Sequence, residues 1–208
     1  LEDTLQASSQ FSDKLEGMLN ALKTNVDRLK NAEPISAHPS RIREQIADND
    51  AILNDLQKRS NALETLKTAA RDVISRGRHD DSAIKDIKNK LSKLNQLWDE
   101  VMDTANNRDK DLKDTLKVAH KFWDELGTVT RALKEIQDNL ESQEPPAVEP
   151  NAIKEQKEVL HEIKQDIEQT KPEVEIVRQT GKELVHLVGE PEKPEIHKNI
   201  DDLENVWD

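Results

Sequence analysis

The 208-residue sequence contains no cysteine, and aromatic residues make up only 2% of it. Without cysteine there can be no disulfide, no thiolate metal site and no cysteine nucleophile, and the fold does not depend on an oxidising compartment. An intracellular location is therefore favoured. So few aromatic rings also leave little surface on which the bases of a nucleic acid could stack.

Long apolar runs and a balanced charge are missing as well. No stretch approaches the roughly 20 apolar residues that a membrane-spanning helix needs, and the first residues lack a signal-peptide pattern. The net charge is -12, of which residues 111–208 carry -11 and residues 1–110 carry -1. Acidic surfaces repel nucleic-acid phosphates and anionic lipid, so neither a nucleic acid nor a membrane is expected as a partner.

What the sequence does contain is a long apolar seam, a set of residues that recur alternately three and four positions apart from Ile84 to Leu140. Only Arg108 and Thr115 interrupt the seam, and no proline lies within it. This spacing is typical of a helix that keeps one stripe against partner helices. At 1.5 Å per residue such a helix would be about 85 Å long, so the molecule is expected to be a rod.

The chain also contains an internal repeat of about 110 residues. A shift of 111 residues superimposes Phe11 on Phe122 and Leu22 on Leu133, and after a two-residue deletion a shift of 109 superimposes Trp98 on Trp207. Each copy holds three helical patterns, A, B and C. The predicted units are residues 1–110, with A at 1–32, B at 40–75 and C from 82, and residues 111–208, with A to 142, B at 151–188 and C at 194–208.

Turn residues agree with these boundaries. Ser40 and Asn151 are expected to cap the two B helices, and Gly77 and Gly189 stand where the B helices should end. Pro172, inside the second B helix, is expected to kink it. Short turns make neighbouring helices antiparallel, so each unit is predicted to be a three-helix bundle, and the last helix is expected to be cut short at residue 208.

The apolar stripes predict which side chains form the two cores and which lie at the junction between the units. The predicted core residues are Phe11, Leu15, Leu22, Leu91, Leu94, Trp98, Val101, Phe122, Leu126, Leu133, Ile163, Ile167, Leu203 and Trp207. The predicted junction residues, within the helix that joins the copies, are Ala105, Arg108, Leu112 and Leu116.

The period, the Trp inside helix C and the fusion of C with the next helix A resemble the spectrin repeat over essentially the whole chain. The stretches LNQLWDE at 94–100, EPP at 144–146, KPEVE at 171–175 and GEPEKPE at 189–195 resemble rod repeats of the spectraplakins, which are giant cytoskeletal linkers. The resemblance implies an all-α fold of two tandem spectrin-type three-helix bundles that share a continuous connecting helix, the second being truncated in its last helix. One departure is that Leu22 and Leu133 lie where many such repeats carry Trp, and Trp123 is displaced from that position.

In spectraplakins, the resemblance implies, actin and microtubules are bound by other modules, and the repeats serve as spacer and in places as docking surface. We therefore expect a non-enzymatic structural rod in a cytoskeletal linker, cytoplasmic and cytoskeleton-associated. Its partners would be cytoskeletal or junctional proteins reached through the parent protein. The alternative is a dedicated protein-docking module, for which Trp123 is the candidate exposed anchor. A dimeric coiled coil also fits the heptads, but prolines at equivalent turns favour a monomer that folds back on itself.

Residues for catalysis or cofactor binding are not recognisable. The sequence has no phosphate loop, no nucleophile elbow and no EF-hand loop, so no enzyme activity and no cofactor are expected. His186 and His197 flank an acidic turn with Glu190, Glu192 and Glu195, where solvated side chains are favoured over a weak metal site. One basic cluster, Arg76, Arg78, Lys85 and Lys88, is interpreted as a solvated rim, with docking of an acidic partner as the alternative.

Overall fold

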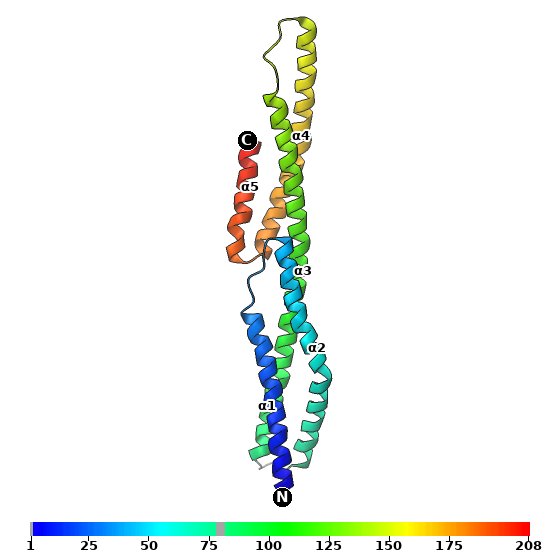
Figure 1. Cartoon of the computed structure of the whole chain (residues 1–208), viewed down its shortest axis with the longest axis vertical. Helices are drawn as coiled ribbons and strands as arrows, with labels where there is room; N and C mark the ends of the chain where they lie inside the picture. The colour runs from blue at the N-terminus through cyan, green and yellow to red at the C-terminus, as the bar shows by residue number, and fades with distance from the viewer. Residues whose placement is uncertain (1, 78–81) are drawn as a thin grey trace. The chain divides into compact units, whose positions relative to one another are not determined.

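A computed structural model describes residues 2–77 and 82–208, and within these ranges the regular secondary structure is helical, without any strand (Figure 1). The elements follow one another as α1 (Glu2–Lys30), α2 (Pro39–Arg76), α3 (Ser82–Glu141), α4 (Pro150–Leu187), the short 3-10 turn η1 (Glu190–Glu192) and α5 (Lys193–Trp207). The prediction of an all-α fold is confirmed.

The 60-residue helix α3 is the element that the apolar seam predicted. It is unbroken from Ser82 to Glu141, so the junction between the two copies of the repeat lies inside a helix. Ile87, Leu94, Leu112 and Phe122 on the seam are fully buried. The prediction of a continuous connecting helix is confirmed.

The chain forms two compact units that are interlaced along the sequence. Unit 1 consists of Leu1–Glu33 and Glu44–Leu112, and unit 2 consists of Pro34–Arg43 and Lys113–Asp208. The expected division at residue 110 places 34–43 in the first unit, whereas the structure groups this segment with the second. Both α2 and α3 therefore contribute residues to each unit.

Unit 1 is built from α1, most of α2 and the first part of α3, with α2 running opposite to its two neighbours (Figure 1). Its core contains Leu15, Leu22, Leu91, Leu94 and Val101 as buried residues. The predicted core residues Phe11 and Trp98 are partly buried and pack against it.

Asn25 and Asn49 are buried polar side chains in the core of unit 1. The Asn49 Nδ2 atom donates to the Ala105 carbonyl oxygen at 3.0 Å, and the Asn25 Nδ2 atom donates to Asp55 Oδ2 at 3.0 Å. Each buried amide thereby bridges two helices, α2 to α3 and α1 to α2.

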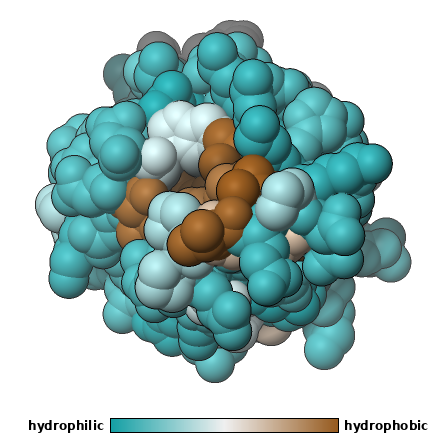
Figure 2. All heavy atoms as spheres, turned by 90° about the horizontal axis from the view of Figure 1, so that it is seen from above, coloured by the Kyte–Doolittle hydropathy of each residue, from teal (hydrophilic) through white to brown (hydrophobic). Residues whose placement is uncertain are grey.

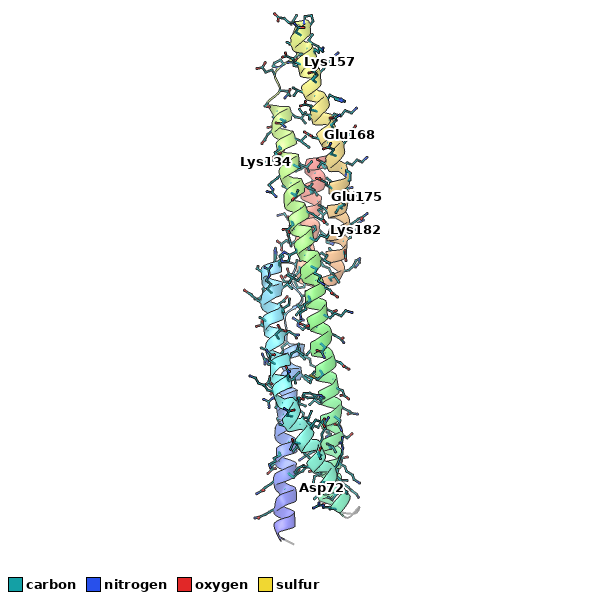
Figure 3. The ribbon with its side chains drawn as sticks, turned by 90° about the vertical axis from the view of Figure 1, so that its right-hand side faces the viewer. Asp72, Lys134, Lys157, Glu168, Glu175 and Lys182 are labelled. Carbon is teal, nitrogen blue, oxygen red and sulfur yellow. The ribbon has the colours of Figure 1, made fainter. Side chains whose placement is uncertain are left out.

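Unit 2 is built from the last part of α3, α4 and α5, together with 34–43. Phe122, Leu126, Leu133, Ile163 and Leu203 are buried, and the predicted core residues Ile167 and Trp207 are half-buried. The helices approach closely at Gly181, where an added Cβ would lie 2.5 Å from Ile200 Cδ1 and 3.0 Å from Phe122 Cε2. Charged side chains such as Lys134, Glu168 and Lys182 point away from the helices (Figure 3).

The helix starts differ from the expected ones. Helix α4 begins at Pro150, its N-cap is Glu149, and no side chain caps it. Asn151 and Ser40 lie inside the first turns of α4 and α2, so the prediction that they are the caps is wrong. Proline suits the first helical position because it lacks the N–H that would have no helical partner there.

Apolar side chains are exposed near the turn between α3 and α4, beyond the reach of the shorter helix α5. Leu140 is 45% exposed, Leu160 49% and Val148 93%. Figure 2 shows an apolar area of the surface that is bordered by hydrophilic residues. Their counterparts in the first copy, Leu29, Asn49 and Ala37, are all buried.

Candidate functional site

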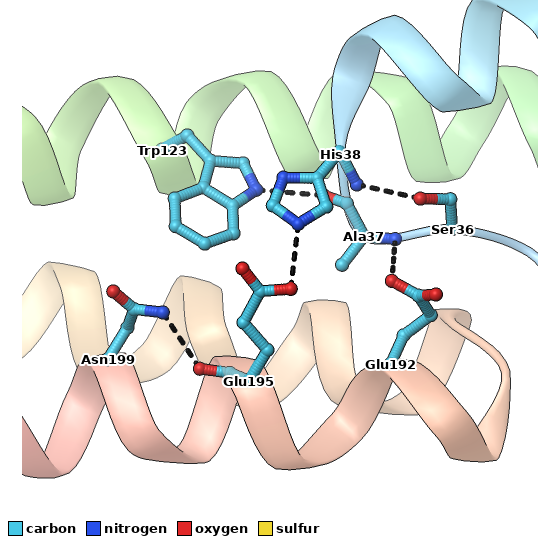
Figure 4. Close-up of polar contacts among 7 residues, drawn as sticks. All are labelled: Ser36, Ala37, His38, Trp123, Glu192, Glu195 and Asn199. Atoms are coloured by element: carbon cyan, nitrogen blue, oxygen red, sulfur yellow. Dashed lines mark hydrogen bonds and ion pairs between the residues drawn. The ribbon is translucent and has the colours of Figure 1, made fainter.

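The candidate site is the place where the segment 34–43, which comprises the end of the connection from α1 and the first residues of α2, is held within unit 2. Three backbone groups of the segment carry the attachment. The Ile35 carbonyl oxygen accepts from the Gly189 N–H at 2.9 Å, and the Ala37 carbonyl oxygen accepts from Trp123 Nε1 at 2.8 Å. The Ala37 N–H donates to Glu192 Oε2 at 3.2 Å (Figure 4).

His38 extends this attachment through its side chain. Its ring stacks on the indole of Trp123, with centroids 5.0 Å apart and an interplanar angle of 17°. Its Nε2 atom lies 2.7 Å from Glu195 Oε2, and its backbone N–H donates to the Ser36 hydroxyl oxygen at 3.1 Å (Figure 4). Because the His38 and Glu195 side chains are 43% and 47% exposed, the pair itself adds only a little stability.

Burial supplies the rest of the attachment. Ser36 is 4% exposed, and Ala37 and Ile42 are fully buried. Arg43, the last residue of the segment, contacts the ring nitrogen Nε2 of His120 on α3. Ser36, Ala37 and Ile42 are therefore packed in the interior of unit 2, although the chain before and after the segment belongs to unit 1.

Gly189 is the residue that lets the segment come so close. A Cβ added to Gly189 would lie 2.1 Å from Pro34 Cβ and 3.2 Å from Pro34 Cα. Contacts below 3.0 Å do not occur between real side chains, so any other residue would push the two backbones apart. The sequence marked Gly189 only as the end of a helix.

Trp123 is not the free anchor that the docking alternative requires. It is half-buried, its ring is stacked on His38, and its N–H is bonded to the Ala37 carbonyl oxygen. It also meets Phe122 edge-on, at a centroid distance of 5.1 Å. The interpretation of Trp123 as an exposed anchor is wrong because the 34–43 segment covers it.

The predicted junction residues lie on α3 at the boundary between the units. Ala105 and Leu112 are fully buried in unit 1, and Leu116 in unit 2 is half-buried. Arg108, which interrupts the seam, donates from its guanidinium Nη2 to the Glu33 carbonyl oxygen at 2.9 Å, and its burial lowers the pKa of the guanidinium. The interruption thus provides a donor for the backbone that follows α1.

The predicted basic cluster lies at the turn between α2 and α3. Arg76 forms an ion pair with Asp72 on its own helix at 3.3 Å, and Lys85 and Lys88 are exposed. Arg78 lies outside the described residues. The docking of an acidic partner at this cluster stays a prediction.

The acidic turn before α5 brings together a different set of groups from the one considered in the sequence. Ligand atoms of His38, Glu192 and Glu195 all lie within 4.8 Å of one another. Among the residues searched, His186 and His197 are not members of this cluster. His38 was missed because it is distant in sequence and stands in a connecting segment without periodicity.

No helix in the described part of the chain has the length and apolar character needed to span a membrane.

Comparison with known proteins assigns the family. Models of the spectrin repeat match residues 6–114 and 118–208. The chain belongs to the spectrin repeat family. It is 33% identical over 210 residues to microtubule-actin cross-linking factor 1, isoforms 6/7, of Mus musculus, a match that covers 100% of this chain and 6% of that protein.

Two further relatives also match the whole chain. Microtubule-actin cross-linking factor 1, isoforms 1/2/3/4/5, of Homo sapiens is 33% identical over 213 residues, which are 3% of its length. The Rattus norvegicus protein is 32% identical over 213 residues, which are 4% of its length. The chain thus spans a small fraction of these relatives, and the predicted resemblance to spectraplakin repeats is confirmed.

Proposed function

We propose that this pair of spectrin repeats is a non-enzymatic structural segment, a rod-like spacer within a cytoskeletal linker protein. Similarity to microtubule-actin cross-linking factors over the entire chain supports the proposal. Association with the cytoskeleton would then come through the parent protein, and the partners of that parent would be cytoskeletal proteins. The function of the pair of repeats is to hold two points of the longer parent chain apart and to transmit mechanical load between them.

The interlacing of the units is the observation that carries the mechanical part of this proposal. In the sequence, residues 34–43 separate the two parts of unit 1, 1–33 and 44–112, but they pack within unit 2. Helix α3 contributes buried residues to the cores of both units. When unit 2 unfolds, it releases the 34–43 segment, which contains the first residues of α2. Unfolding one unit therefore removes a support of the other, and we expect the pair to resist load as one cooperative body.

Breaking α3 at Leu112 tests the proposal. Proline there removes a backbone hydrogen bond and clashes with the preceding turn, at a cost of about 3 kcal/mol or more. We expect wild-type protein to unfold in urea in a single transition and Leu112→Pro to unfold in two, as followed by circular dichroism. The matched control is Leu112→Ala, which loses buried area but keeps the helix, and should destabilise without splitting the transition. A single transition for Leu112→Pro contradicts the mechanical coupling.

A further inference from the structure

We propose that His38, Glu192 and Glu195 form a binding site for one divalent transition-metal ion of the zinc class, which would fasten the 34–43 segment to the turn between α4 and α5. Candidate ligand atoms from all three residues lie within 4.8 Å of one another. They comprise one imidazole nitrogen and two carboxylate oxygens, a donor set that zinc accepts in proteins. Without any thiolate, the site is poorly suited to Cu(I).

The local structure aims these three groups at one point. Glu192 ends η1, and Glu195 lies three residues later on α5, so both carboxylates project toward the segment that carries His38 (Figure 4). The His38 ring is oriented by its stacking on Trp123, and the backbone before it is fixed by the bond from Trp123 Nε1 to the Ala37 carbonyl oxygen. The Ala37 N–H holds one oxygen of Glu192, in the way that outer hydrogen bonds orient metal ligands.

The three candidate ligand atoms could bind one ion after movements of their side chains alone. Ligands at ~2.0–2.1 Å from a tetrahedral zinc are about 3.3 Å apart. The 2.7 Å contact between His38 Nε2 and Glu195 Oε2 would open slightly, and the wider separations would close. Both side chains are nearly half exposed and can rotate, and their exposure leaves room for water to complete the coordination.

The spectrin fold does not require this trio, so its presence is not explained by the repeat pattern. A shift of 111 residues aligns His38 with Glu149, and a shift of 109 aligns Glu192 with Ala83 and Glu195 with Asp86. These counterparts belong to different units, Glu149 to unit 2 and the other two to unit 1. Asp86 there accepts from the Ser12 hydroxyl at 2.8 Å and pairs with Lys90 at 3.3 Å. The three candidate ligands thus converge in unit 2, whereas the repeat pattern does not bring their aligned counterparts into one unit.

Titration of tag-free, chelator-treated protein with Zn²⁺ by calorimetry, and with Co²⁺ by visible absorption, tests the site. We expect one saturable ion per chain, Co²⁺ bands of a low-coordinate site, and an upward shift of the thermal unfolding midpoint that grows with free Zn²⁺.

The variants His38→Gln, Glu192→Gln and Glu195→Gln keep hydrogen-bonding groups while removing the metal ligands. Each should weaken Zn²⁺ binding at least about tenfold, by analogy with the loss caused by altering outer partners of metal ligands. His197→Gln and Glu190→Gln, which change nearby exposed side chains of unit 2, should leave it unchanged.

Circular dichroism in the absence of metal checks that each variant is folded. If His38→Gln does not fold, the Zn²⁺ affinity of Glu192→Gln is the measurement that tests the site. Absence of saturable binding by wild-type protein overturns the proposal. So does binding that the ligand variants and the control variants lose equally, because this would be adventitious attraction to an acidic surface. Neither result bears on the cooperative unfolding tested with Leu112→Pro.

Discussion

At the residue scale, the contact between Gly189 and Pro34 decides whether the 34–43 segment can enter unit 2. We expect Gly189→Ala to destabilise the protein by about 1–3 kcal/mol, since the new methyl group would overlap Pro34. Urea unfolding measures the change in the free energy of unfolding. Gly127→Ala is the matched control in the same unit, because its Cβ meets nothing within 4 Å. Alanine there should stabilise α3 by up to about 1 kcal/mol. Equal effects of the two substitutions would contradict the close approach.

Asp55 makes the stability of unit 1 depend on pH. Hydrogen bonds from the Asn25 amide and then from Arg59 lower the pKa of its carboxyl group below the ordinary value. A group whose pKa is lower in the folded state stabilises that state above the unfolded pKa, and this contribution is lost as the pH falls through the folded pKa. Asp55 therefore favours the folded state at neutral pH and ceases to do so in acid.

We expect Asp55→Asn to lower the free energy of unfolding at pH 7. The difference in this free energy between wild type and variant should become smaller below about pH 4. Urea unfolding at a series of pH values measures it. Asp48→Asn, at an exposed position of the same helix, serves as control and should show a smaller gap. A gap for Asp55→Asn that stays constant down to strong acid would rule out this role.

At the element scale, α3 was predictable because its pattern is local and repeated. Leu94, Val101, Leu112 and Phe122 recur at helical spacing, and burial of such a stripe is the dominant stabilisation of a helix. The starts of α2 and α4 were less predictable, since proline and a side-chain cap are both common there. Pro39 and Pro150 are the first residues of α2 and α4, and each lies one residue before the expected cap, Ser40 or Asn151.

The attachment site could not be predicted, and the reason lies in sequence separation. His38 meets Glu195 across 157 positions, and Trp123 meets Ala37 across 86. Neither periodicity nor turn chemistry reports on contacts of that range. Trp123 stood one step off the seam, which indicated a side chain outside the helical core but not its partner.

Helix α4 continues through Pro172, which is an internal position that a proline destabilises. We expect Pro172→Ala to raise the free energy of unfolding by about 1–3 kcal/mol, because it restores an N–H and removes a clash with the preceding turn. Thermal unfolding followed by circular dichroism measures it. Pro150→Ala, at the first helical turn, should change little because proline is tolerated there. An unchanged free energy of unfolding for Pro172→Ala would contradict the expectation that the proline destabilises α4.

At the scale of the whole molecule, the chain crosses between the units three times, at 33–34, 43–44 and 112–113. Two of these crossings place 34–43 within unit 2, and the third is the continuous helix α3. A chain of independent domains would cross once per boundary. We therefore expect a defect in one unit to lower the stability of the other.

Hydrogen exchange at increasing urea, followed by mass spectrometry, tests this claim most directly. Exchange is read separately in residues 53–66 of unit 1 and 174–184 of unit 2, for wild type and Gly189→Ala. We predict that both regions of the wild type open together, and that Gly189→Ala lowers the urea midpoint of both. If the substitution shifts residues 174–184 while residues 53–66 keep the wild-type midpoint, the two repeats unfold independently and the coupling is contradicted.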